Sequence, residues 1–239
     1  MNIEEFSNIF IDEAKKVDIE LNEKQIVLFY KYMEMLLEWN EKINLTAITE
    51  VKEIVVKHFI DSILVAKFIK PESKIIDVGT GAGFPGIPLK IYNESYKLTL
   101  LDSLNKRTIF LQEVVKELGL ENVEIIHGRA EDYAQDMKYR EIYDYAISRA
   151  VAPLNILLEY LVPYTCVNGT VIAMKGNNAE EEIKNAQNAM NKLCVNIREK
   201  EKIELPDNSG ERFILVFEKK QKTNKIYPRK AGTPKKNPL

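Results

Sequence analysis

The first third of the chain spaces its apolar residues as helices do. They recur three or four positions apart from Ile3 to Val17 and again from Ile26 to Leu37, a pattern that buries one face of a helix. A third segment, over about residues 50–68, follows Thr49 as its expected N-cap and carries two glutamates in its first turn. We therefore predict a helical region over residues 1–70.

The pattern changes after Pro71. Short apolar runs rich in β-branched residues now alternate with helical patterns over residues 106–118, 154–161 and 179–193. The runs predicted as strands are Lys74–Gly79, Lys97–Leu101, Val123–His127, Tyr143–Ser148 and Gly169–Met174. Strands that alternate with helices indicate a mostly parallel α/β sheet that is covered on both faces.

Two further strands close the predicted sheet. Val195–Ile203 and Arg212–Glu218 are separated by a turn segment, Pro206–Gly210, so they are expected to form an antiparallel terminal hairpin. The chain then divides into three predicted parts: the helical region over residues 1–70, an α/β domain over residues 71–219, and a C-terminal tail over residues 220–239.

Composition narrows the class of protein. The chain has 239 residues, 45% hydrophobic and 29% charged, which is typical of a globular protein with a sizeable core. No run approaches the roughly 18 apolar residues of a transmembrane helix, and residues 1–10 lack the pattern of a secretory signal. Cys166 and Cys194 are too few and too far apart for a zinc site or a disulfide scaffold. We expect a cytoplasmic, monomeric protein without a metal.

Positive charge is concentrated at the C-terminal end. Overall, 34 Lys and Arg oppose 36 Asp and Glu, but residues 219–239 hold eight cations and no acid. Residues 1–218 therefore carry 26 cations against 36 acids, a net charge of about −10. An acidic body with a basic tail indicates contact with a polyanion such as RNA. A solvated tail without a partner would show the same pattern, so both interpretations stay open.

The richest motif is the glycine loop, residues 77–86, with the sequence Asp-Val-Gly-Thr-Gly-Ala-Gly-Phe-Pro-Gly. Glycines after a strand let the backbone approach a ligand closely, and the loop formally matches the dinucleotide fingerprint. Two features argue against a nicotinamide cofactor: Asp77 would repel a pyrophosphate, and Pro85 interrupts the entry into the following helix. A carboxylate here suits a cationic ligand, and S-adenosylmethionine carries an ammonium and a sulfonium.

Acidic residues also follow the next two predicted strands. Asp102 ends the second strand, where a carboxylate can accept hydrogen bonds from both ribose hydroxyls of a nucleotide. Glu131 lies just past the third strand, at the position expected to face the adenine. Any one of the acids Asp77, Asp102 and Glu131 could simply cap a helix, but three in succession beside the glycine loop favour a ligand site.

These motifs resemble the class I S-adenosylmethionine-dependent methyltransferases, whose sheet is Rossmann-like, and more closely the RsmG family, also called glucose-inhibited division protein B. The resemblance covers about residues 40–239. It rests on the glycine loop and on the segments Asn44–Ile48, His58–Ser62, Leu101–Arg107, Ile147–Ala150, Lys175–Gly176 and Tyr227–Pro234.

The resemblance implies an enzyme that transfers a methyl group from S-adenosylmethionine to N7 of a guanine in 16S rRNA of the small ribosomal subunit. It places the cofactor contacts on Gly79, Phe84, Ala130, Glu131 and Arg149. Asp102 joins them from the ribose argument. Arg149, at the end of the fourth strand, is the candidate to orient the cofactor or the guanine, and a surface arginine paired with an acid is the alternative.

The implied reaction does not require the protein to remove a proton from the substrate. Guanine N7 has an exposed lone pair and no proton to lose, so in-line displacement needs alignment rather than a general base. His58 and Asp61 lie three residues apart and are expected to be a structural pair rather than RNA contacts. His127 is expected to be structural, Trp39 to anchor the core, and Lys106 and Arg107 to face either RNA phosphate or solvent.

Two other functions remain as alternatives. A nicotinamide-dependent oxidoreductase could use a similar glycine loop, although Asp77 and the terminal hairpin disfavour it. A non-enzymatic RNA-binding assembly factor could retain the same pocket, although the intact acids at all three strand ends argue against loss of function.

Overall fold

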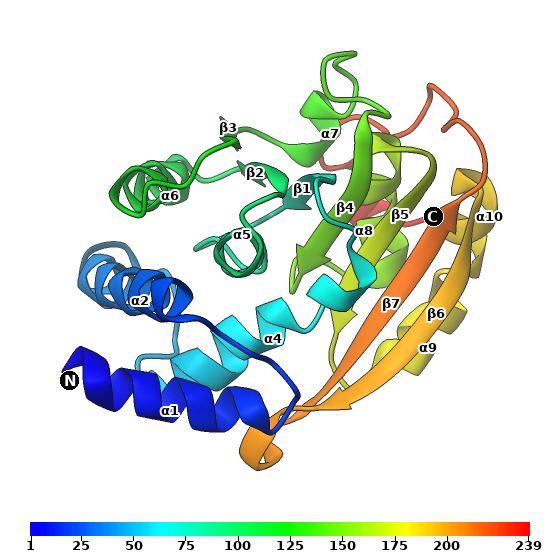
Figure 1. Cartoon of the computed structure of the whole chain (residues 1–239). Helices are drawn as coiled ribbons and strands as arrows, with labels where there is room; N and C mark the ends of the chain where they lie inside the picture. The colour runs from blue at the N-terminus through cyan, green and yellow to red at the C-terminus, as the bar shows by residue number, and fades with distance from the viewer.

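The computed structural model describes residues 1–239, and a seven-stranded sheet forms its centre (Figure 1). The strands are β1 (Lys74–Val78), β2 (Lys97–Asp102), β3 (Val123–His127), β4 (Tyr143–Arg149), β5 (Thr165–Lys175), β6 (Val195–Glu204) and β7 (Glu211–Lys219). Their order is β3-β2-β1-β4-β5-β7-β6, and β7 is antiparallel to both of its neighbours. The predicted mostly parallel sheet with an antiparallel terminal hairpin is confirmed.

The two N-terminal helices begin with the same capping arrangement. Helix α1 (Ile3–Lys15) follows Asn2, and helix α2 (Glu23–Ile43) follows Asn22. Each asparagine side chain accepts a hydrogen bond from a backbone N–H in the first turn, and the side chain of the residue at that position accepts one from the asparagine backbone. These capping boxes satisfy amide groups that a helix start leaves unpaired.

The third helical segment differs from the single helix predicted over residues 50–68. It consists of α3 (Val51–Ile54), a π-helical stretch η1 (Val55–Ile60), α4 (Asp61–Ile63) and a 3-10 turn η2 (Ala66–Phe68). The predicted N-cap was also wrong by one residue, because the Glu50 carboxylate rather than Thr49 accepts from the Glu53 amide. π-Helical turns are rare and are often found at functional sites.

The remaining helices lie between the strands or after them. They are α5 (Gly86–Tyr92), α6 (Asn105–Glu117), α7 (Ala130–Tyr133), α8 (Leu154–Leu161), α9 (Ala179–Asn185), α10 (Gln187–Leu193) and α11 (Thr233–Lys236), with 3-10 turns η3 (Val162–Tyr164) and η4 (Pro206–Asn208). The helix predicted over 179–193 is broken at Ala186, whose φ of −93° and ψ of 2° leave the helical range. None of the helices combines the length and apolar character that crossing a bilayer requires.

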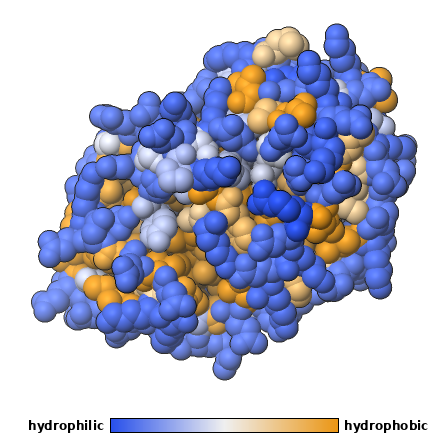
Figure 2. Space-filling model, turned by 45° about the vertical axis from the view of Figure 1, so that its right-hand side comes forward, coloured by the Kyte–Doolittle hydropathy of each residue, from blue (hydrophilic) through white to orange (hydrophobic).

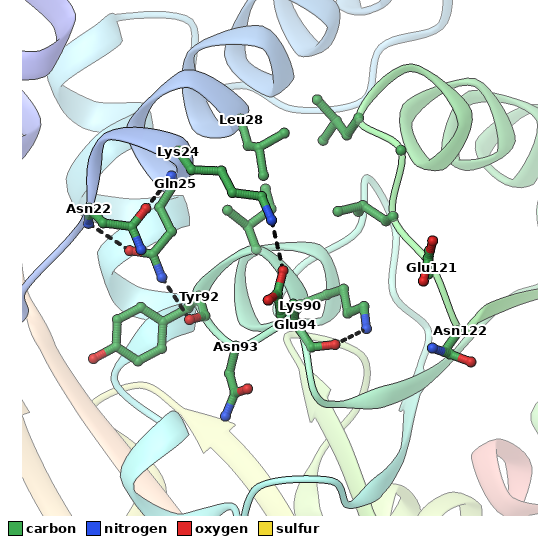
Figure 3. Close-up of a pocket in the computed structure, with 14 residues that line it drawn as sticks. Asn22, Lys24, Gln25, Leu28, Lys90, Tyr92, Asn93, Glu94, Glu121 and Asn122 are labelled. Carbon is green, nitrogen blue, oxygen red and sulfur yellow. Dashed lines mark hydrogen bonds and ion pairs between the residues drawn. The ribbon is translucent and has the colours of Figure 1, made fainter.

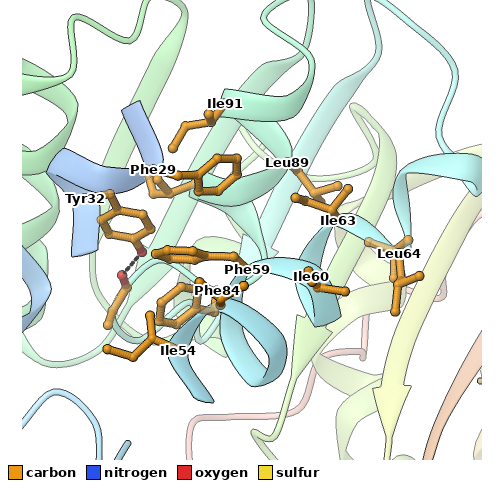
Figure 4. Close-up of a cluster of buried hydrophobic side chains, with 14 of the residues drawn as sticks. Phe29, Tyr32, Ile54, Phe59, Ile60, Ile63, Leu64, Phe84, Leu89 and Ile91 are labelled. Atoms are coloured by element: carbon orange, nitrogen blue, oxygen red, sulfur yellow. Dashed lines mark hydrogen bonds between the residues drawn. The ribbon is translucent and has the colours of Figure 1, made fainter. Parts of the chain in front are cut away.

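Successive apolar side chains of the central strands enter two separate apolar cores. Ile75 and Leu100 join a core of 38 buried residues shared with α1, α2, α5 and α6, whereas Ile76 and Leu101 join a core of 27 shared with α8 and α10. Figure 4 shows the first core where α2, η1, α4 and α5 meet, with Phe59 close to Tyr32 and Phe84. The N-terminal helices therefore cover one face of the sheet, and the predicted division at residue 70 does not interrupt that core.

The outer surface is mainly polar. Figure 2 shows a face that is mostly hydrophilic, with apolar residues showing between polar ones chiefly in the lower left of the view.

The tail, residues 220–239, is folded back onto the body rather than extended. Glu159, which is fully buried, accepts from the backbone and guanidinium of Arg229, and Arg140 donates to the Thr223 and Tyr227 carbonyls.

This docking reduces the number of free charges on the tail. Of the eight cations in residues 219–239, Lys219 is buried against Glu141, Lys220 pairs with Glu218, and Arg229 pairs with Glu159. Five exposed lysines keep no ion pair: Lys222, Lys225, Lys230, Lys235 and Lys236. The cationic surface available to a polyanion is therefore smaller than the sequence suggests.

Candidate functional site

The glycine loop leaves the carboxyl end of β1 and folds back against β2. The Gly79 amide donates to the Leu101 carbonyl at 2.8 Å, and Gly79 has a φ of +72°, in the left-handed region that favours glycine. A Cβ at this position would lie 2.5 Å from Cγ2 of Val151. Any side chain here would be both strained and obstructed, which explains the glycine physically.

Asp77 shapes this loop from beneath. Its Oδ2 accepts from the Thr80 hydroxyl at 2.7 Å and from the Gly86 amide at 2.9 Å, and the residue is completely buried. Its Oδ1 is also buried and has no hydrogen-bond partner. Burial raises the pKa of Asp77 to about 7, although the bonds from Thr80 and Gly86 oppose this shift. The carboxyl therefore retains one acceptor that nothing in the protein satisfies.

The other two acids also make structural bonds. Asp102 accepts from the Gly81 and Leu104 amides at 2.9 Å, and Glu131 accepts from the Gly232 amide of the tail at 2.8 Å. The interpretation that the strand-end acids have structural roles is thus partly correct, since each carboxylate accepts a hydrogen bond from at least one backbone amide. A carboxylate oxygen has two lone pairs, however, so both side chains keep acceptor capacity for a ligand.

A cavity of about 190 Å³ lies over the ends of β1, β2 and β3 and brings together four of the predicted cofactor residues. Gly79, Asp102, Ala130 and Glu131 all line it. Two tail residues, Gly232 and Lys235, line it as well. Sequence reasoning missed them because the tail carries no signal for the contact with Glu131, which lies 101 residues away in the chain.

Arg149 lines a second cavity, of about 650 Å³, which shares Val151 with the first. Its guanidinium donates through Nη1 to the Lys57 carbonyl at 3.0 Å and to Asp61 Oδ2 at 2.7 Å. Its Nη2 lies 3.2 Å from Nδ1 of His58. Arg149 is thus paired with an acid, as the alternative interpretation held, but in a pocket wall rather than on the open surface.

Phe84 lines neither cavity. Its ring is buried in the core, stacked on the His58 ring at 4.4 Å and covered by the Arg149 guanidinium at 5.0 Å. Burial, and next the charge of Arg149, lower the pKa of His58 to about 3. His58 is therefore neutral, accepts from Arg149 through Nδ1, and donates from Nε2 to the Thr46 hydroxyl at 2.9 Å.

The remaining sequence candidates have local roles. His127 is exposed, with Nε2 3.2 Å from the Ser103 carbonyl, and Lys106 donates to the Ile43 carbonyl at 2.9 Å. Arg107 points back to Asp102, with 3.5 Å between Nη1 and Oδ2. Trp39 packs against Phe110 at 5.6 Å between ring centroids. No group of three or more His, Cys, Asp or Glu side chains is arranged to hold a metal ion.

A third cavity, of about 560 Å³, lies at the opposite end of the sheet, between α2, the end of α5 and the α6–β3 connection (Figure 3). Several of its polar groups bond to one another: Lys24 pairs with Glu94, Gln25 donates to the Tyr92 carbonyl, and Lys90 donates to the Glu94 carbonyl. Ligands of open α/β sheets bind at the carboxyl ends of the strands. The 190 and 650 Å³ cavities are therefore the functional candidates.

The strand order, the glycine loop and the carboxylates at the strand ends define a class I S-adenosylmethionine-dependent methyltransferase. Solved structures share this fold at low sequence identity. A SAM-dependent methyltransferase from Aquifex aeolicus is 18% identical, with a TM-score of 0.54 over 71% of this chain and 93% of its own. The TYW2 protein of M. jannaschii, solved in complex with AdoMet, is 19% identical, with a TM-score of 0.51 over 66% of this chain and 74% of its own.

Sequence comparison identifies the family. The family model described as rRNA small subunit methyltransferase G, GidB, matches residues 25–206. Proteins named ribosomal RNA small subunit methyltransferase G are 50% identical in Alkaliphilus metalliredigens, over 97% of this chain and 98% of the relative, and 48% identical in Lactococcus lactis subsp. lactis, over 96% and 98%. The chain belongs to this family, so the predicted methyltransferase is confirmed over the nicotinamide and assembly-factor alternatives.

The residues of the smaller cavity fit the methyl donor. Asp102, which lines it, keeps lone pairs for ribose hydroxyls, and Gly79 forms part of its wall, where a Cβ would collide with Val151. Asp77 lies outside the cavity lining, beneath the glycine loop, with Oδ1 buried and without a partner. When bound, S-adenosylmethionine supplies a methyl group activated on a cationic sulfur. The individual cofactor contacts of Gly79, Phe84, Asp102, Ala130, Glu131 and Arg149 stay predictions.

Proposed function

We propose that this enzyme methylates N7 of a guanine in the 16S rRNA of the small ribosomal subunit, by in-line displacement without a general base. The relatives' names support the rRNA of the small subunit as substrate. The choice of N7 is supported by an observation in the larger cavity: both of its carboxylates are paired with cations, and its one histidine has both ring nitrogens bonded.

The groups that could act as a base in this cavity each have a partner. His58 is neutral but has both ring nitrogens bonded, to Arg149 and to Thr46. Asp61 is held by Arg149 and Arg212, and Glu182 is paired with Lys175. Methylation of an amide or exocyclic amine nitrogen would need such a base, whereas N7 already presents its lone pair. Positioning and electrostatics are what the protein contributes.

The test is incubation of the enzyme with a labelled methyl donor and isolated small subunits, followed by mapping of the modified nucleotide. Mass spectrometry against N1-, N2- and N7-methylguanosine standards identifies the methylated atom. We expect label in a single guanosine at N7. Label at N1 or N2 would contradict the proposal, because those positions lose a proton during methylation.

We further propose that the tail contacts RNA phosphate, and that the enzyme acts as a monomer in the cytoplasm, where ribosomal RNA is found. Truncation after Glu218 would remove the partners of the half-buried Glu141 and the fully buried Glu159. Replacement by glutamine is the cleaner test, and Lys235 is left intact because it lines the cofactor cavity. The positions to change are Lys222, Lys225, Lys230 and Lys236.

We expect the salt dependence of RNA binding to flatten by roughly 0.7–0.9 of a unit in its logarithmic slope for each phosphate that the tail no longer neutralises. The control replaces Lys116 and Lys192, which are exposed on α6 and α10 and form no ion pair. An unchanged slope in the tail variant would show that the tail does not bind phosphate. Sedimentation of the purified enzyme tests the monomer.

A further inference from the structure

The larger cavity has no assigned ligand. Its volume of about 650 Å³ lies within the range of roughly 300–1,000 Å³ that is usual for small-molecule sites. Val151 forms a wall common to this cavity and the cofactor cavity. A group bound in it would therefore lie next to the methyl donor, at the carboxyl ends of β4 and β5.

The charge of this cavity is opposite to that of the rest of the protein. Four cations and two acids line it: Lys57, Arg149, Lys175 and Arg212 against Asp61 and Glu182. His58, which also lines it, is neutral. Residues 1–218 carry a net charge of about −10, so a local excess of positive charge is unusual here. It favours an anionic ligand and disfavours the cationic donor.

Arg212 is the cation of this cavity that is best able to bind a ligand. Its Nε donates to Asp61 Oδ1 at 3.1 Å and its Nη1 to the Glu211 carbonyl at 3.0 Å, but its Nη2 has no partner. The other cations are more fully engaged. Lys57 pairs with Glu53, Lys175 pairs with Glu182, and Arg149 makes three contacts.

Asp61 holds the two arginines in place. Its side chain is only 1% exposed, and its two oxygens accept separately from Arg149 on β4 and Arg212 on β7. The hairpin that carries Arg212 is itself anchored at its tip, where Asp207 pairs with Lys16 of the N-terminal region at 2.7 Å. The η1–α4 segment, which carries Lys57, His58 and Asp61, and the terminal hairpin thus both contribute to this cavity.

We propose that this cavity receives the target nucleotide of the RNA after it has left the base stack, with Arg212 binding a phosphate of that nucleotide and Asp61 positioning Arg212 and Arg149. The inference rests on the proposed function, because it takes RNA as the substrate. Enzymes that modify a base commonly bind it unstacked in a pocket. A planar guanidinium with free N–H groups matches phosphate oxygens better than an ammonium does.

The experiment compares Arg212→Ala and Arg212→Lys with Arg198→Ala. Arg198 lies on β6 of the same hairpin, is exposed, and forms no ion pair, so it is a matched control. Five quantities are measured: KM and kcat with isolated small subunits, the salt dependence of RNA binding, the Kd for S-adenosylmethionine, and the melting temperature.

For Arg212→Ala we expect KM to rise about 10- to 100-fold, as the removal of charge-assisted hydrogen bonds predicts, and the salt slope to fall by about one unit. The cofactor Kd is expected to stay within about twofold of the wild type. Arg212→Lys restores the salt slope but only part of KM. Arg198→Ala behaves as the wild type. Asp61→Asn raises KM to a similar extent, and its double variant with Arg212→Ala is no worse than either single variant, because the two act as a unit.

The inference is overturned if Arg212→Ala matches Arg198→Ala in KM and salt slope. It is also overturned if KM rises only together with loss of cofactor binding and melting temperature, because Arg212 would then serve folding. Should Asp61→Asn fail to fold, the Arg212 variants alone decide the phosphate contact. A wild type that methylates another atom with the same dependence on Arg212 would refute the N7 proposal and leave this inference standing.

Discussion

Replacement of Asp102 by asparagine separates the two roles of this carboxylate. Asp102 accepts from the Gly81 and Leu104 amides and lines the cofactor cavity. Asparagine keeps the shape but turns one acceptor into a donor. A hydrogen bond to a charged group contributes about 1.5–3 kcal/mol, so removal of one ribose hydrogen bond, at about 2 kcal/mol, weakens donor binding about 30-fold. Isothermal titration calorimetry with S-adenosylmethionine measures this directly.

The same substitution places an N–H₂ group against the Gly81 or Leu104 amide. We expect the melting temperature to fall by about 2–8 °C, which corresponds to about 1–2 kcal/mol for a domain of this size. The control is Asp132→Asn, an exposed carboxylate beside Glu131 that lines neither functional cavity. A lowered melting temperature with a donor Kd within about threefold of the wild type would refute the ribose contact and leave Asp102 with the loop alone.

Three further perturbations test other parts of the structure. Gly79→Ala is expected to weaken donor binding at least about tenfold, because a left-handed φ costs a residue with a side chain about 1–2 kcal/mol and because the new Cβ collides with Val151. Adding Val151→Ala removes the collision but not the backbone strain. Full recovery of donor affinity in the double variant, measured by calorimetry, would therefore argue against backbone strain. The pKa of Asp77 in the folded protein, about 7, lies above its ordinary value, so between about pH 4 and 7 the folded state holds a proton that the unfolded state has lost. The free energy of unfolding is therefore expected to fall over this range as pH rises, relative to that of Asp77→Asn. Denaturant titrations that show no such fall would contradict the raised pKa. Glu159→Gln is expected to lower the free energy of unfolding by about 2–4 kcal/mol, since Arg229 loses its buried partner. Amide hydrogen exchange is expected to become faster in the tail alone. Unchanged exchange there would contradict the role of Glu159 as the anchor of the tail.

The elements of the fold could be predicted closely because their signals are local. Each predicted strand was found, and the largest error in a strand boundary was four residues at the start of β5. Errors occurred where side-chain bonds set the local geometry. The Glu50 carboxylate, not Thr49, caps α3, and a π-helical stretch replaces part of the helix predicted after it. Neither feature leaves a trace in hydrophobic periodicity.

The site was predicted in part for the same reason. Gly79, Asp102 and Glu131 follow strand ends, and parallel strands bring those ends to one edge of the sheet, so their meeting in one cavity was foreseeable. Phe84 was expected beside them, but its side chain lies in the core under Arg149. The direction of a side chain within a loop depends on packing that the loop's sequence does not reveal.

The amino-acid sequence by itself determined the succession of strands and helices along the chain, the glycine loop and the acids at the strand ends, because short-range spacing and backbone sterics govern all of these. Only the tertiary structure decided which charges are free. It joined Asp61 to Arg149, 88 residues away, and to Arg212, 151 residues away, and it paired Arg229 of the tail with the buried Glu159. Such contacts come from the way distant elements pack. A charged residue looks the same in the sequence whether its side chain is exposed to solvent or held in an ion pair.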